Sequence, residues 1–141
     1  MRLLNKMLLV LSFFLVIISC QNRVEKERVA FTEPSVFFKN IQNGAVLSSP
    51  FVVEMGVEGM EVEPSGPVNR NKGHHHIIID RTCMEDGEII PVDKQHIHYG
   101  GGQTEAELNL EPGNYSLTLQ FANGMHQSYG NMCKTINVTI R

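Results

Sequence analysis

The chain has 141 residues, about the length of one domain, so we expect one folded domain rather than two. Its formal net charge is −3 at pH 7, and charged residues make up only 19% of the chain. This composition provides no basic surface for a polyanion, and we therefore exclude nucleic acid as an expected partner.

The first 20 residues have the pattern of a bacterial lipoprotein signal peptide. Arg2 and Lys6 precede an apolar run over residues 7–18, which is shorter than the roughly 18 or more residues of a membrane-spanning helix. Residues 17–20, Ile-Ile-Ser-Cys, then resemble the lipobox, in which a cysteine becomes acylated and forms the new N-terminus. Ordinary secretion with an incidental cysteine is the alternative.

The lipobox resemblance implies an outer-membrane lipoprotein. Residues 1–19 would be removed, and Cys20 would carry acyl chains that hold the protein at the membrane. Gln21 follows the cysteine where an aspartate would retain the protein in the inner membrane, so we expect an address in the outer part of the cell envelope. Residues 20–34 contain few large apolar side chains and mixed charges, and we expect them to form a lipidated flexible tether.

From Ser35 onward the apolar residues alternate with polar ones. This period of two predicts half-buried strands, and it is clearest over residues 53–58, 105–110, 114–121 and 135–140. Turn-forming pairs such as Asn-Gly, Asp-Gly and Pro-Gly separate these segments. Several short strands with regular turns predict an all-β fold: a small immunoglobulin-like antiparallel β-sandwich over residues 35–141.

One short motif supports the immunoglobulin-like form of the sandwich. Residues 110–115 read Leu-Glu-Pro-Gly-Asn-Tyr and lead into a predicted strand. The pattern resembles the tyrosine corner, in which the tyrosine hydroxyl bonds back to the chain a few residues upstream. We therefore expect Tyr115 to make such a bond.

All six histidines lie between positions 74 and 126. Two H-x-H pairs stand on predicted strands, and alternate residues of a strand project from the same face about 6.6 Å apart, so each pair can converge on one ion. A further histidine lies in a predicted loop that can cover such a site. The candidate metal ligands are His74, His76, His96, His98 and His126.

Imidazole ligands favour copper or zinc as the bound ion. Three methionines near the histidines or cysteines, Met84, Met125 and Met132, offer thioethers for Cu(I) but also serve as packing residues. In the alternative, the histidines are buried and hydrogen-bonded, or brace loops, and bind no metal.

Cys83 and Cys133 remain once Cys20 is lipidated, which is an even number in an oxidising compartment. A disulfide between them is our prediction. The alternative is a copper site that uses their thiolates, because each cysteine has a methionine beside it.

Enzyme signatures are absent from the sequence. It contains no nucleophile elbow, no zinc-protease helix motif and no phosphate-binding loop, so we expect the protein not to be an enzyme. A third hypothesis is a small metalloenzyme whose metal has an open coordination position.

Two resemblances extend this interpretation. The segments Gly73–Asp80, His96–Ala106 and Leu110–Gly113 resemble a bacterial secreted family, domain of unknown function 4399, over roughly Ser35 to Arg141. That resemblance implies the fold unit and export. The run from Pro112 to the last strand is also similar to the C-terminal half of periplasmic copper-resistance carrier domains, in which His126 would have a counterpart.

The sequence therefore favours a membrane-anchored, non-enzymatic domain of the cell envelope that binds copper or zinc. The alternative function is a metal-free interaction module. In that case the histidines would organise loops, and an exposed edge would contact another envelope protein or a glycan.

Overall fold

The computed structural model describes residues 32–141. The predicted signal peptide, the lipidated Cys20 and the tether as far as residue 31 lie outside the described residues. Over residues 32–141 the structure contains no helix with the length and apolar character that crossing a bilayer requires.

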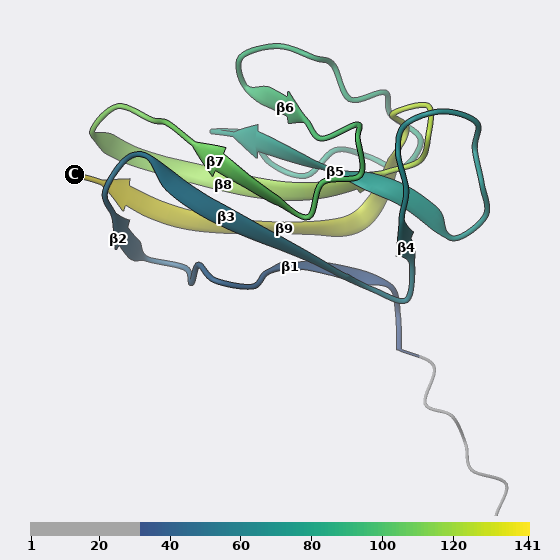
Figure 1. The fold of residues 1–141 in the computed structure, drawn as a ribbon, viewed down its shortest axis with the longest axis horizontal. Helices are drawn as coiled ribbons and strands as arrows, with labels where there is room; N and C mark the ends of the chain where they lie inside the picture. Colours follow the sequence, from purple (N-terminus) through teal and green to yellow (C-terminus); the bar gives the residue numbers. More distant parts are fainter. Residues whose placement is uncertain (1–31) are drawn as a thin grey trace, which may run out of the picture. The chain divides into compact units, whose positions relative to one another are not determined.

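The described strands form two sheets (Figure 1). The three-stranded sheet is antiparallel, with the order β1 (Ser35–Phe38), β3 (Phe51–Glu58) and β7 (Glu105–Leu108). The six-stranded sheet has the order β2 (Ala45–Leu47), β9 (Ser128–Ile140), β8 (Gly113–Ala122), β5 (Lys72–Ile79) and β4 (Glu61–Val62), and β6 (His96–His98) also pairs with β5.

The core confirms the β-sandwich and the alternating strand faces on which it was predicted. Val53 and Met55 of β3, together with Leu117 and Leu119 of β8, have no exposed surface. Burying a side chain of this size contributes about 1.5–3 kcal/mol. The hydroxyl of Tyr115 donates to the carbonyl of Glu111 at 3.0 Å, which confirms the tyrosine corner.

The six-stranded sheet is mixed rather than wholly antiparallel. β2 runs parallel to β9, and β4 runs parallel to β5. A short hairpin forces an antiparallel pair, but neither of these pairs is joined by one. Between β4 and β5, residues 63–71 return the chain to the start of the neighbouring strand and form a loop beside the histidines.

A further segment of the chain covers the outer face of the six-stranded sheet. The alternating pattern had predicted that this face would be exposed to solvent. Thr118 and Gln120 of β8 point to that face and are fully buried. The hydroxyl of Thr118 donates to the carbonyl of Arg81 at 2.7 Å, and Gln120 Oε1 accepts from the backbone N–H of Met84 at 3.1 Å. The segment of residues 80–95 therefore acts as a lid, and polar side chains rather than apolar ones fasten it.

Candidate metal centre

Strand β5 places two histidines on the covered outer face of the six-stranded sheet. His74 and His76 have no exposed surface, and their Nε2 atoms lie 3.1 Å apart. Alternate residues of a strand share a face, which is why these two side chains lie together and His75 does not join them. Ala122 stands opposite His74 on β8, so a small side chain faces that imidazole.

The register between β5 and β6 brings in a third histidine. His98 is the direct partner of His76 on the antiparallel pair, and the centroids of the two rings lie 5.0 Å apart. His74, His76 and His98 each offer a ring nitrogen, and these three atoms all lie within 4.8 Å of one another.

The turn between β8 and β9 adds a fourth histidine. Its start follows Ala122, which pairs with His74, so the turn lies at the same end of the sheet as the other imidazoles. His126 Nε2 lies 3.1 Å from His98 Nε2. The side chain of Asn123 stabilises the turn, because its Oδ1 accepts hydrogen bonds from the backbone N–H groups of Met125 and Gln127. We call His74, His76, His98 and His126 the histidine cluster.

Two nitrogen–nitrogen distances in the histidine cluster are close to those around one tetrahedral ion. Imidazole nitrogens bind zinc at about 2.0–2.1 Å, which places two ligands of a tetrahedral ion roughly 3.4 Å apart. The two Nε2–Nε2 contacts, His74 with His76 and His98 with His126, are both 3.1 Å. In a hydrogen bond between two imidazoles, only the accepting nitrogen offers a lone pair. A bound cation would accept a lone pair from each of the two nitrogens.

Burial favours the neutral form of His74, His76 and His98, which is the form that binds metal. Burial, with the charges of His98 and His126, lowers the pKa of His74 to about 4. Burial and the neighbouring histidines lower the pKa of His76 to about 2, and burial followed by His126 lowers the pKa of His98. The Nδ1 atoms of His74 and His76 are buried and make no hydrogen bond within residues 32–141.

The loop of residues 63–71 contacts the chain two residues away from His98 and two residues away from His126. The N–H of Ser65 donates to the carbonyl of Gly100 at 2.8 Å, and the N–H of Gly66 donates to the carbonyl of Gly124 at 2.9 Å. A Cβ on Gly100 would collide with the ring of His98, and one on Gly124 would collide with the carbonyls of Gly66 and Pro67. A glycine two residues from each of these histidines in the sequence is the signal that could have indicated this close approach.

The remaining predicted ligand, His96, lies outside this group. It pairs with Ile78, one step further along the same face than His98, and its Nδ1 donates to Asp93 Oδ1 at 2.8 Å. Asp93 was not among the predicted site residues, although its position three residues before His96 suits this bond. A register two residues different would have set His96 opposite His76 and His98 opposite His74.

His75 occupies the other face of β5, inside the sandwich. Its ring packs edge-on against Phe121 with centroids 5.0 Å apart, and neither ring nitrogen has a hydrogen-bond partner within the described part of the chain. Burial, followed by the charges of Lys39 and His74, lowers its pKa to about 4. His75 therefore behaves as a neutral core residue.

Comparison with known protein families identifies a family that matches most of the described chain. Residues 53–141 match the family described as Domain of unknown function (DUF4399), which is more than half of the chain. The chain belongs to this family. Curated proteins and solved structures yielded no match.

The region matched by the family, residues 53–141, contains the whole histidine cluster and both remaining cysteines. It begins at Val53 within β3, so β1 and β2 of the sandwich lie before it. The candidate metal centre is thus formed entirely by residues of the family domain.

Cys83 and Cys133 form a disulfide with their Cα atoms 5.9 Å apart. The bond ties the lid of residues 80–95 to β9, and in this form both sulfurs are used, which leaves no thiolate for the alternative copper site. Met132 is buried in the core, and Met125, beside His126, is 63% exposed.

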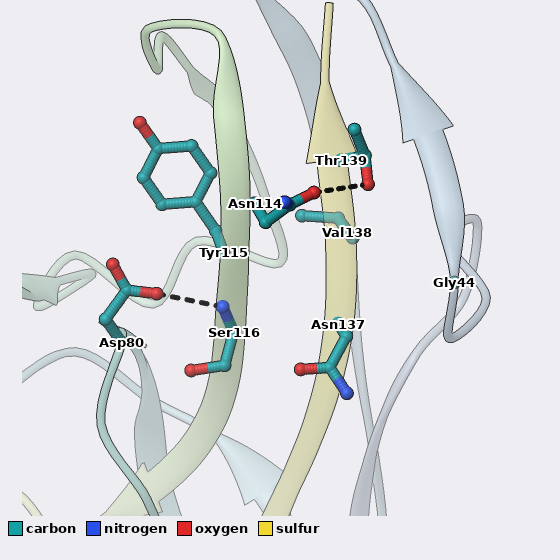
Figure 2. A pocket seen from close by; sticks show the side chains of 8 residues that line it. All are labelled: Gly44, Asp80, Asn114, Tyr115, Ser116, Asn137, Val138 and Thr139. Atoms are coloured by element: carbon teal, nitrogen blue, oxygen red, sulfur yellow. Dashed lines mark hydrogen bonds between the residues drawn. The ribbon is translucent and has the colours of Figure 1, made fainter.

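The family domain also has a hollow of about 490 Å³ on β8 and β9, away from the histidines (Figure 2). Asn114, Ser116, Asn137 and Thr139 contribute to its lining. Several of its polar groups already bond one another: Asp80 Oδ1 accepts from the N–H of Ser116 at 2.9 Å, and Thr139 donates to Asn114 Oδ1 at 2.8 Å. None of its lining residues is a histidine, so this hollow offers no imidazole ligand for a metal.

Proposed function

We propose that this domain binds one transition-metal ion through the histidine cluster, and that its role is binding rather than catalysis. The observation that supports the proposal is the convergence of ring nitrogens from His74, His76 and His98, which lie within 4.8 Å of one another. The 3.1 Å approach of His126 to His98 supplies a fourth nitrogen.

The metal we propose is copper or zinc. The cluster offers four imidazoles and no carboxylate or thiolate among its members, a donor set that suits Zn(II) and Cu(II) and disfavours Mg²⁺ and Ca²⁺. Four nitrogen ligands fill a tetrahedral shell, which is the arrangement of a holding site rather than of a catalytic site with an open position.

We also propose that the domain works at the outer membrane, anchored through acyl chains on Cys20. The signal-peptide pattern of residues 1–20 supports this address. The disulfide between Cys83 and Cys133 supports export as well, because such bonds persist in oxidising compartments.

The test is titration of the full chain, purified without a histidine tag, with Zn(II) and with Cu(II) at pH 7.4 in a calorimeter. His98→Asn should weaken binding on the order of 100-fold, because apparent zinc-binding energies of about 10–16 kcal/mol are shared among four ligands. The matched control is His96→Asn on the same strand, which should leave the affinity unchanged because His96 bonds Asp93 instead.

Two results would contradict the proposal. One is binding of both metals weaker than about 10 µM, which is roughly −7 kcal/mol. The other is an equal loss of affinity in the two variants. Either result would favour the metal-free interaction module, for which Ile89, Val92 and Met125 offer exposed apolar side chains.

A further inference from the structure

The four members of the histidine cluster are not held alike. His74 and His76 stand in β5, which is bonded to β8 on one side and to β6 on the other. Both side chains are fully buried, and close packing leaves such rings no room to turn. His98 lies in β6, opposite His76. These three ring nitrogens already satisfy the mutual distances of a metal site.

His126 differs from the other three because it stands in a turn rather than in a strand, and because its ring lies furthest from the ring of His76. It stands in a turn with φ of +66°, a left-handed conformation that costs a non-glycine residue roughly 1 kcal/mol or more. Its side chain is half-buried, as is that of His98, and the preceding Met125 is 63% exposed. Its Nε2 meets His98, but its ring centroid lies 5.9 Å from that of His76.

The backbone of this turn is fixed, so a movement of His126 must be a rotation of its side chain. Asn123 bonds Met125 and Gln127 from within the turn, and the N–H of Ile90 donates to the carbonyl of His126 at 2.9 Å. A half-buried ring beside an exposed neighbour can turn toward solvent without opening the core.

We propose that His126 is an exchangeable fourth ligand, and that the metal-loaded domain accepts a small monodentate anion in its place. This inference rests on the proposed metal-binding function. In the exchange the bond between the metal and His126 Nε2 breaks and a bond from the metal to the anion forms, while His74, His76 and His98 keep the ion. An ion held in this way can pass to another chelator by ligand exchange, which a fully caged ion does not.

The experiment uses the full chain loaded with Co(II), whose visible absorption reports coordination, and azide as the entering anion. The wild-type protein and His96→Asn should show an azide-dependent change in the spectrum. His126→Ala should keep its Zn(II) affinity within about tenfold of wild type and bind azide at least about tenfold more tightly, because no imidazole competes for the position. His98→Asn should instead lose Zn(II) affinity on the order of 100-fold.

Three outcomes would overturn the inference. In the first, His126→Ala loses as much Zn(II) affinity as His98→Asn. In the second, azide binds the wild-type and His126→Ala proteins with equal affinity. In the third, azide changes the spectrum of neither protein. Failure of the wild-type protein to bind Zn(II) or Co(II) is measured before azide is added. That result would contradict the proposed function itself and is therefore distinguishable.

Discussion

His98 lies directly opposite His76 on the antiparallel pair of β5 and β6, and Gly100 leaves the space that its ring occupies. A Cβ at position 100 would collide with Cε1 and Nε2 of His98, the ring atoms that face the cluster. The position of this imidazole therefore depends on a glycine two residues away in the sequence. The first prediction follows from that dependence.

Gly100→Ala should displace the ring of His98 and weaken Zn(II) binding about 10- to 100-fold, a loss typical of a disturbed support around a metal ligand. The matched control is Gly101→Ala, where the atoms nearest to the added Cβ belong to the flexible side chain of Gln103. Calorimetric titration of both variants checks the prediction. Equal affinities in the two variants would show that His98 is not a ligand in this position.

The stability of the metal-free protein should fall when the pH drops below about 6.5. His74 and His75 have folded pKa values of about 4, and His76 has one of about 2. Below pH 6.5 the unfolded chain binds protons that the folded chain does not, so acid favours unfolding. Each group lowers the free energy of unfolding by about 1.4 kcal/mol per pH unit until the pH reaches its folded pKa.

Urea denaturation in the presence of a chelator at pH 7, 6 and 5 measures this loss. His75→Leu serves as the comparison, because it removes one titrating group from the core without touching the histidine cluster. Its slope with pH should be smaller by about 1.4 kcal/mol per unit, while its Zn(II) affinity stays the same. A free energy of unfolding that does not change between pH 7 and 5 would contradict the lowered pKa values.

The disulfide should stabilise the domain by restricting the unfolded chain. Its cysteines are 50 residues apart, which corresponds to about 4 kcal/mol in the chain-entropy estimate. Cys83→Ser together with Cys133→Ser should lower the free energy of unfolding by a comparable amount. Denaturation of the oxidised wild-type protein and of the double variant at pH 7 measures this difference. A thiol assay of the oxidised protein should find no free thiol except that of Cys20, where Cys20 is not acylated. Two further reactive thiols in the aerobically purified protein would contradict the bond.

Cys20→Ala should leave the protein without acyl chains and move it from the membrane fraction to the released fraction. The physical reason is that acyl chains supply the membrane affinity of a lipoprotein, at about 0.8 kcal/mol per buried CH₂ group. Fractionation and acyl labelling of the wild-type and variant proteins measure the effect. A variant that stays labelled and membrane-bound would show that the anchor lies elsewhere.

The sequence by itself determined the fold class and the face of β5 on which His74 and His76 lie. The alternation of Val53 and Met55 with polar residues, like that of Leu117 and Leu119, specifies which face enters the core, because side chains of a strand alternate between two faces. The same rule separates His74 and His76 from His75. It also predicted that paired strands could bring two H-x-H motifs together.

Only the tertiary structure decided which histidines meet. Periodicity fixes the face of a side chain but not its position along a neighbouring strand, and a shift of two residues between β5 and β6 preserves every face while exchanging His96 for His98. The lid of residues 80–95 and the loop of residues 63–71 have no periodic pattern, so their placement over the site depends on long-range bonds to β8 and to Gly100 and Gly124. The burial that keeps the histidines neutral arises from those contacts.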